Sequence, residues 1–220
     1  MTKAEREAKL KLRFEELNVY ERKFRSEGFS YIAGVDEVGR GPLAGSVVAA
    51  AVILPQDFYC LGIDDSKKLS EKKRELLFDE IRHGAIAYGI GCVDNEEIDR
   101  INILEATKKA MKNAIEEAEK RLRDAIGSGI DMIIFDAVKI EAIKTPQISL
   151  IKGDSKSISV AAASIIAKVT RDRMMEEYDA VYPGYGFSSN KGYGTALHYE
   201  GIKKQGMTPI HRRSFLKKLL

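Results

Sequence analysis

Four acidic residues stand where an apolar segment of the sequence gives way to a loop or a helix start. Asp36 and Glu37 end one apolar run, Asp136 ends another, and Asp154 follows a strand-like piece. Such positions can converge at one edge of an α/β sheet. Converging carboxylates raise one another's pKa unless cations neutralise them, and oxygen ligands without nearby cysteine or histidine pairs favour Mg²⁺ or Mn²⁺. For any single acid, capping a helix or ending a strand is the commoner role.

Two glycine-containing segments have residue types that suit contact with a nucleotide. Gly39 and Gly41 allow a ligand to approach the backbone closely, and Arg40 between them can reach a phosphate. Tyr193 lies between two further glycines, so its ring can lie flat against a sugar or base. The alternatives are a tight turn between strands for the first segment and ordinary loop packing for Tyr193.

Basic residues mark two candidate surfaces for phosphate. Lys67 lies just before an expected helix N-terminus, where backbone amides favour anions, although a solvated lysine beside a capped helix is the alternative. From Lys191 to Leu220 there are seven lysines and arginines against one acid, a local net charge of +6 in a chain whose total is +3. This segment is a candidate phosphate surface or a solvated helical face. Within it, His211 and its two following arginines could approach phosphates, and structural hydrogen bonding is the alternative.

Length and composition indicate a single folded core. The 220 residues are 44% hydrophobic and 31% charged, which excludes wholesale disorder. The start lacks the apolar stretch of a secretory signal, and the longest apolar run, residues 47–54, is too short to span a bilayer, so a cytoplasmic protein without a membrane segment is expected. Cys60 and Cys92 lack metal-ligand spacing and are expected to be buried free thiols.

Apolar periodicity and capping residues predict a mixed sheet flanked by helices. Strands are predicted at residues 31–35, 46–54, 85–93, 130–135 and 147–152. Helices are predicted at residues 1–28, 70–82, 157–178 and 195–205, with a short one after Asp94 and a long one from Asn102 to Gly127. In the long helix one continuous face is predicted, formed by Leu104, Thr107, Met111, Ile115, Ala118 and Leu122.

Six segments in order resemble bacterial ribonuclease HII: YIAGVDEVGRGPLAGSVVAAAV, DDSKKLS, FDAVKI, KGDSKSISVAAASIIAKVTRDRMM, NKGYGT and TPIHRRSF. The resemblance covers residues 16–216. It implies an α/β ribonuclease H-like fold at residues 29–185, preceded by an N-terminal helical extension at 1–28 and followed by a small helical substrate-binding region at 186–220. It also implies an endonuclease that hydrolyses the RNA strand of RNA/DNA hybrids and cuts 5′ of single ribonucleotides embedded in duplex DNA, in ribonucleotide removal.

The resemblance also assigns the candidate residues. The four acids match the family's acidic quartet, which is expected to hold two Mg²⁺ or Mn²⁺ ions for in-line hydrolysis giving 3′-hydroxyl and 5′-phosphate ends. The Gly39 to Gly41 loop matches the segment that contacts the ribose. Tyr193 matches the tyrosine that packs on the next sugar, and Lys67 is expected at the phosphate backbone.

Two other classes of function stay open at this point. One is a related nuclease of the ribonuclease HIII or resolvase-like type, and the other is a non-catalytic hybrid-binding protein. Intact VDEVGRG and NKGYGT segments favour ribonuclease HII, and a non-catalytic protein would be expected to have lost an acid. His198 and His211 are not expected to bind metal. A monomer is expected.

Overall fold

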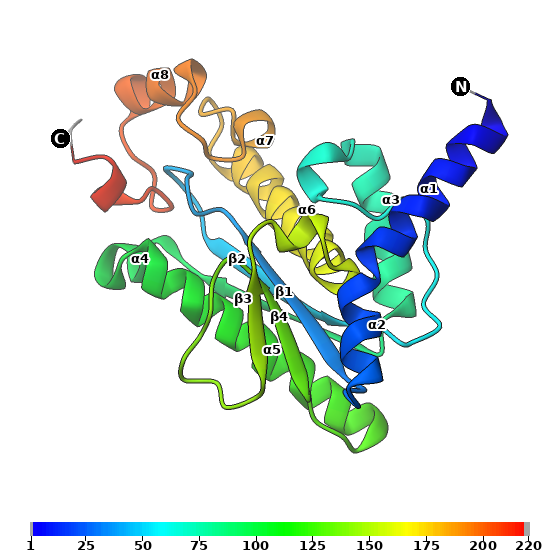
Figure 1. Ribbon diagram of the computed structural model, residues 1–220. Helices are drawn as coiled ribbons and strands as arrows, with labels where there is room; N and C mark the ends of the chain where they lie inside the picture. Colours follow the sequence, from blue (N-terminus) through cyan, green and yellow to red (C-terminus); the bar gives the residue numbers. More distant parts are fainter. Residues whose placement is uncertain (1, 218–220) are drawn as a thin grey trace.

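A five-stranded mixed sheet lies at the centre of the computed structural model, which describes residues 2–217 (Figure 1). The strand order is β3-β2-β1-β4-β5, so the first strand along the chain is central. Strands β1 and β2, and β2 and β3, are antiparallel, whereas β1 and β4, and β4 and β5, are parallel. This confirms the predicted mixed sheet. The strands are β1 (Ile32–Val38), β2 (Val47–Ile53), β3 (Ala87–Val93), β4 (Met132–Asp136) and β5 (Gln147–Leu150).

Two long helices cover the two faces of the sheet. Helix α5 (Ile103–Ile126) packs on one face against β3, β2 and β1, and α6 (Ile158–Val181) packs on the other against β1 and β2. Glycines bring both helices close to the strands. A Cβ at Gly91 would lie 2.0 Å from the carbonyl oxygen of Ala110, and one at Gly34 would lie 2.1 Å from the backbone carbon of Ser159.

The N-terminal helices lie on the α6 side of the sheet, next to α3 (Figure 1). Helices α1 (Lys3–Leu17) and α2 (Val19–Ser26) replace the single helix predicted for residues 1–28. The break falls at Asn18, whose side-chain amide donates a hydrogen bond to the carbonyl of Phe14 at 2.8 Å. Phe14 and Leu17 are buried in the same apolar cluster as Leu77 of α3 (Glu71–Gly84) and the alanine-rich part of α6.

Capping residues set the helix starts as predicted. The side chain of Asp94 accepts from the amide of Glu97 ahead of α4 (Asn95–Ile101), and that of Asn102 accepts from the amides of Leu104 and Glu105 at the start of α5. Ser157 accepts from Val160 at the start of α6. Helix α5 ends at Gly127, which has a φ of 70°.

Leu104, the first residue of the predicted face of α5, is 42% exposed. Two sequence-based expectations about exposure and strand ends are wrong. Cys92 is exposed, whereas Cys60 is buried as expected. Strand β1 extends through the acids to Val38 rather than ending at Val35, because its pairing with β2 continues to Val48.

The C-terminal part packs on the far end of α6. Helix α7 (Phe187–Asn190), which was not predicted, is followed by α8 (Ala196–Gln205), and Thr195 caps the latter. After α8 the described chain has an isolated β-bridge between His211 and Ala44 and a short 3-10 turn, Arg213–Phe215. None of the helices within residues 2–217 combines the length and apolar character needed to cross a membrane. The apolar contacts of this region come from Ala44, Met175, Tyr185, Phe187 and Ile210.

Candidate active site

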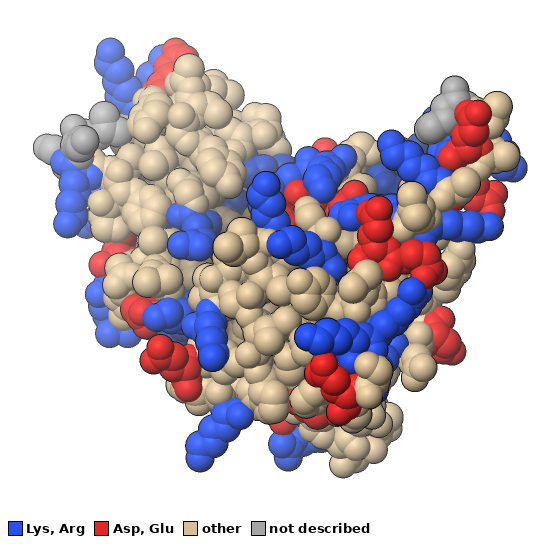
Figure 2. Space-filling model, viewed as in Figure 1, with Lys and Arg blue, Asp and Glu red and all other residues tan. Residues whose placement is uncertain are grey.

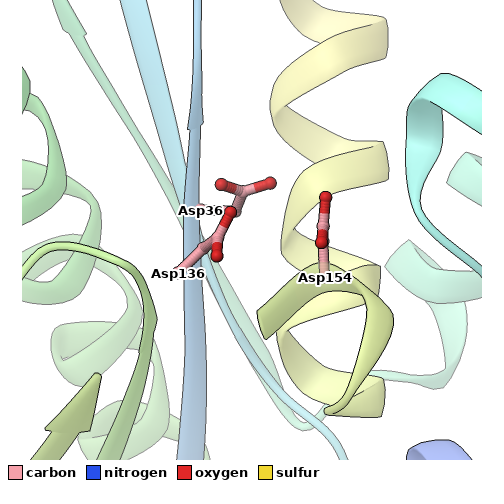
Figure 3. Close-up of side chains that lie close together, drawn as sticks. All are labelled: Asp36, Asp136 and Asp154. Atoms are coloured by element: carbon pink, nitrogen blue, oxygen red, sulfur yellow. The ribbon is translucent and has the colours of Figure 1, made fainter. Parts of the chain in front are cut away.

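Three aspartates from distant parts of the chain meet at one edge of the sheet. Asp36, Asp136 and Asp154 each offer a carboxylate oxygen, and these three oxygens lie within 4.8 Å of one another. In Figure 3 the carboxylates of Asp36 and Asp136 project from neighbouring strands toward Asp154, which comes from the turn beside α6. Asp36 and Asp154 are buried, and Asp136 is half-buried. The arrangement confirms the expected convergence for three of the four acids.

Strand register explains why the first two aspartates meet. Strands β1 and β4 are parallel, with Val35 opposite Phe135, so Asp36 and Asp136 follow at neighbouring positions on the same face. Asp154 lies in the 3-10 turn η2 (Gly153–Ser155) that follows β5 at the same edge. The amide of Gly153 donates a hydrogen bond to Oδ1 of Asp136 at 2.8 Å, which ties this turn to β4.

The cluster is electrostatically costly without a cation. Burial, followed by the charges of Glu37 and Asp136, raises the pKa of Asp36 well above its ordinary value. Burial and the charges of Asp65 and Asp136 also raise the pKa of Asp154. Three converging carboxylate oxygens are the ligand set that hard divalent cations such as Mg²⁺ prefer, so the residues fit a metal site.

Glu37 lies outside the group of three. It follows Asp36 on β1, and its carboxylate is not among the three whose oxygens lie within 4.8 Å of one another. Its Oε1 accepts from Nη1 of Arg40 at 3.2 Å, and its Oε2 is buried with no hydrogen-bond partner among the described residues. Burial, and to a lesser extent the charge of Asp136, raises the pKa of Glu37, while the charge of Arg40 lowers it. An unpartnered buried oxygen at this place is compatible with a cation ligand.

Lys67 is the nearest basic residue to the cluster. It lies in the 3-10 turn η1 (Ser66–Lys68), and its Nζ lies 4.0 Å from Oδ2 of Asp154. Burial lowers the pKa of Lys67, but the charges of Asp36 and Asp154 outweigh this effect, so the pKa is raised overall. The side chain remains 78% exposed, and it is therefore free to meet a ligand that enters the site.

The loop after β1 is held by a buried arginine from the C-terminal tail. Arg212 is fully buried, and its Nη2 donates to the carbonyl of Gly39 at 2.6 Å. Its Nη1 donates to the carbonyl of Arg40 at 3.1 Å, and its Nε donates to that of Gly45 at 2.9 Å. Burial lowers the pKa of Arg212 to about 9, so the side chain stays charged at neutral pH. Of the two roles that the sequence left open for Arg212, contact with phosphates and structural hydrogen bonding, the structure shows the second, because all three nitrogens of its guanidinium group donate inside the protein.

A second buried arginine joins this loop region to the loop that carries Tyr193. Arg171 of α6 donates from Nη2 to the carbonyl of Ala44 at 3.1 Å, and from Nε to that of Ser46 at 2.9 Å. Its Nη1 donates to the carbonyl of Lys191 at 2.8 Å. Two segments separated by about 150 residues of chain are therefore held by one planar guanidinium group.

The two candidate sugar-contacting segments lie side by side. A Cβ placed on Gly41 would lie 3.3 Å from Cε1 of Tyr193, and the amide of Leu43 donates to the carbonyl of Gly192 at 2.8 Å. Tyr193 is 48% exposed, so its ring is accessible to a ligand. Figure 2 shows that the surface is hollowed between the α7 and α8 region and the α1 and α3 region, with lysines and arginines around the hollow.

A chain of hydrogen bonds through two histidines ends on the backbone of Tyr193. Nδ1 of His198 lies 2.9 Å from the Tyr193 carbonyl, and Nε2 of His198 lies 3.0 Å from Nε2 of His211. Nδ1 of His211 accepts from the Thr208 amide at 2.8 Å. The contacts are satisfied when His198 carries its proton on Nδ1 and His211 on Nε2. Burial, then the charge of His198, lowers the pKa of His211 to about 4, in keeping with a neutral pair.

The supporting residues were missed from the sequence. Arg171 follows the alanine-rich part of α6 and stands among the charged residues Lys168, Asp172 and Arg173, so nothing in the sequence marks it or shows which carbonyls it reaches. Arg13 and Glu21, in the N-terminal helices, also contact segments beside the cluster. Both residues lie in the N-terminal amphipathic segment, and nothing in the sequence there indicates these contacts.

The sheet order and the aspartate cluster at the carboxyl ends of its parallel strands define a ribonuclease H-like protein. The structure of ribonuclease H2 from Pyrococcus horikoshii is similar, with a TM-score of 0.65 and 29% identity over 86% of this chain and 96% of that one. Residues 33–218 match the family model described as ribonuclease HII. The ribonuclease HII of Listeria innocua is 55% identical over 97% of this chain and 78% of the relative, and that of Ruminiclostridium cellulolyticum is 56% identical over 93% and 77%.

The chain belongs to the ribonuclease HII family. It is accordingly a hydrolytic endonuclease of the ribonuclease H type, a metal-dependent class that acts on RNA/DNA hybrids.

Proposed function

We propose that this enzyme both hydrolyses the RNA strand of RNA/DNA hybrids and cuts on the 5′ side of single ribonucleotides embedded in duplex DNA. The products are 3′-hydroxyl and 5′-phosphate ends, and the role is removal of ribonucleotides from DNA. The observation that carries the proposal is that the carboxylate oxygens of three aspartates lie within 4.8 Å of one another, and that one of them, Asp36, is on the strand that continues into Gly39 and Gly41.

The acids would hold the metal. We infer that Asp36, Asp136 and Asp154 bind Mg²⁺ or Mn²⁺, with Glu37 supplying a further oxygen. Two such ions activate the attacking water and stabilise the departing 3′ oxygen in this class of reaction. Burial and the charges of the neighbouring carboxylates raise the pKa of Asp36 well above its ordinary value. A bound cation would offset this electrostatic cost.

The loop and the tyrosine would read the sugar. A 2′-hydroxyl is both a donor and an acceptor, and backbone groups sense it only at close range. Gly39 and Gly41 allow that approach, and the carbonyls of residues 39 and 40 are fixed by Arg212. Tyr193 stands against Gly41 with an exposed ring that can stack on the following sugar. The pairing favours a junction with RNA on the 5′ side and DNA on the 3′ side.

Two basic side chains would contact the phosphates on either side. Lys67 is exposed beside Asp154, and Arg40 is 45% exposed while paired with Glu37.

We also propose that the chain is divided into an N-terminal helical extension (1–28), a catalytic domain (29–185) and a C-terminal substrate-binding region (186–220), and that it acts as a monomer. Helices α7 and α8 lie in the last of these and bring Tyr193 to the site.

Cleavage of a DNA duplex with one ribonucleotide tests the proposal. We expect a single cut on the 5′ side of the ribonucleotide in Mg²⁺ or Mn²⁺ and no cut in EDTA, because the aspartate cluster needs cations to act. Denaturing gel electrophoresis with end-labelled strands locates the cut, and ligation of the product checks for the 3′-hydroxyl and 5′-phosphate.

An all-DNA duplex of the same sequence is the control. Equal cutting of this control would contradict recognition of the sugar and would favour a less selective, resolvase-like nuclease. Cleavage of an RNA/DNA hybrid without cleavage at the single ribonucleotide would favour a ribonuclease HIII-like specificity. Binding of the hybrid without any cleavage would indicate a non-catalytic hybrid-binding protein.

Substitution of Tyr193 separates stacking from hydrogen bonding. Loss of base or sugar stacking costs about 1–3 kcal/mol, so Tyr193→Ala should lower kcat/KM at the single ribonucleotide by about tenfold to a hundredfold. Tyr193→Phe keeps the ring and should stay within a few-fold of the parent. Steady-state kinetics on the single-ribonucleotide duplex give both values. Equal losses in the two variants would show that the hydroxyl group, and not the ring, carries the contact.

A further inference from the structure

The turn that carries Asp154 is held differently from the two strands of the site. Asp36 and Asp136 belong to hydrogen-bonded strands of the sheet, whereas Asp154 lies in the 3-10 turn η2, which begins after Lys152 with a φ of 59°. Burial and like charges act against Asp154 when it approaches the other aspartates. A turn of three residues therefore needs contacts from elsewhere to hold its carboxylate in place.

Arg13 of α1 supplies one of these contacts. Its Nη2 donates to the carbonyl of Ser155 at 3.0 Å, directly after Asp154. The same guanidinium group makes a two-pronged ion pair with Asp64, at 2.7 Å from Nη2 to Oδ1 and 3.2 Å from Nε to Oδ2. Asp64 comes three residues before Lys67, so Arg13 connects the turn of Asp154 with the segment that carries the lysine of the site. Both side chains are only 25% exposed, which strengthens the pair relative to a surface one.

Glu21 of α2 supplies the second contact. It is 3% exposed, and its Oε1 accepts from the amide of Ser159 at 3.1 Å and from Oγ of the same serine at 2.6 Å. Oγ of Ser157, the capping residue of α6, donates to the same oxygen at 2.5 Å. A carboxylate at a helix N-terminus is stabilised by the amides and the helix dipole. Glu21 therefore fixes the start of α6, three residues after Asp154.

We propose that Arg13 and Glu21 are positioning residues of the reaction, which hold the turn of Asp154 at the separation from Asp36 and Asp136 that a shared cation requires. This inference rests on the proposed role of Asp154 as a metal ligand. Both residues precede residue 33, where the match to the family model begins. The N-terminal helices are thus a support of the site in addition to packing on α3 and α6.

Metal binding and kinetics of Arg13→Met and Glu21→Gln test the inference. We expect each variant to bind Mn²⁺ more weakly than the parent by several-fold to about tenfold, as is usual when a residue supporting a ligand is changed. Isothermal titration calorimetry on the metal-free protein measures this without any turnover. In cleavage assays the Mn²⁺ concentration for half-maximal rate should rise by the same factor, while KM for the duplex changes less than twofold.

Arg6→Met is the matched control. Arg6 is an exposed arginine on the same helix, and its replacement should change neither Mn²⁺ affinity nor rate. Glu21→Gln keeps the shape of the side chain and one acceptor oxygen, so it preserves a folded protein for measurement. Arg13→Lys can restore one of the lost contacts, and partial recovery of Mn²⁺ affinity in this variant supports the positioning role.

Three outcomes would overturn the inference. A raised KM for the duplex with unchanged Mn²⁺ affinity would show that Arg13 contacts nucleic acid directly. Unchanged Mn²⁺ affinity and unchanged rate in both variants would show that the N-terminal helices pack against the protein without positioning Asp154. Asp154→Asn distinguishes failure of the positioning role from failure of the proposed function. If Asp154→Asn keeps full Mn²⁺ affinity and activity, the metal site itself is misassigned. If it loses both while Arg13→Met loses neither, only the positioning role is refuted.

Discussion

Asp36→Asn is expected to lower the rate of RNA strand hydrolysis by at least about a thousandfold while leaving duplex binding nearly intact. A bound cation contributes several kcal/mol to the transition state, and about 4 kcal/mol corresponds to a factor of a thousand. Asp36 is one of the three aspartates whose carboxylate oxygens lie within 4.8 Å of one another, so its replacement removes a ligand from the cluster. Single-turnover cleavage and a binding titration in Ca²⁺ measure the two quantities separately.

The same variant should be more stable than the parent when metal is absent. Burial and neighbouring charges raise the pKa of Asp36 above its unfolded value, so folding takes up a proton and stability falls as pH rises toward and through that raised pKa. Replacing Asp36 with asparagine removes this pH-dependent loss of stability. In EDTA at neutral pH we expect a higher melting temperature for Asp36→Asn, and a loss of most of the stabilisation that Mg²⁺ gives the parent.

Asp124→Asn is the control for both measurements. Asp124 is exposed near the end of α5, away from the cluster, and the variant should keep the activity and melting temperature of the parent. Full activity of Asp36→Asn, or an unchanged response of its melting temperature to Mg²⁺, would remove Asp36 from the metal site.

Arg212→Met should cause the largest loss of stability, about 3 kcal/mol. Three buried carbonyls lose charge-assisted hydrogen bonds, each worth about 1.5–3 kcal/mol, and removal of a buried charge offsets part of this loss. In a protein of this size the melting temperature should fall by roughly 6–12 °C. Because two of the carbonyls belong to Gly39 and Arg40, cleavage at a single ribonucleotide should also fall by more than tenfold at temperatures where the variant is folded.

Arg213→Met tests whether the loss of stability in Arg212→Met comes from the buried contacts of that arginine or from the loss of a positive charge near the C-terminus. Arg213 follows directly in the sequence but is exposed, so its replacement should leave the melting temperature within about 2 °C of the parent. Arg212→Lys keeps the charge but not the planar fork and should resemble Arg212→Met more than the parent. Equal stability of Arg212→Met and the parent would show that the loop after β1 holds its shape without this side chain.

The sequence predicted helix starts and ends well where a residue within a few positions sets them. Helix starts at Ser70, Asp94 and Asn102 follow from side chains that cap within three residues, and the end of α5 follows from Gly127. Helical periodicity predicted a face of α5 but not the residue at which that face becomes buried, and Leu104 at its start is 42% exposed. The break at Asn18 was missed because the apolar spacing on both sides of it is compatible with one helix.

The amino-acid sequence by itself determined the acids, the glycine-flanked arginine, the tyrosine and the family to which they belong. Only the tertiary structure decided that three aspartates meet while Glu37 lies apart, since a register between β1 and β4 sets which strand residues are neighbours. It also decided that Arg212 reaches Gly39 across 173 residues of chain, and that Arg13 reaches the turn beside Asp154. Capping and periodicity act over a few residues, whereas these contacts depend on how separate elements pack.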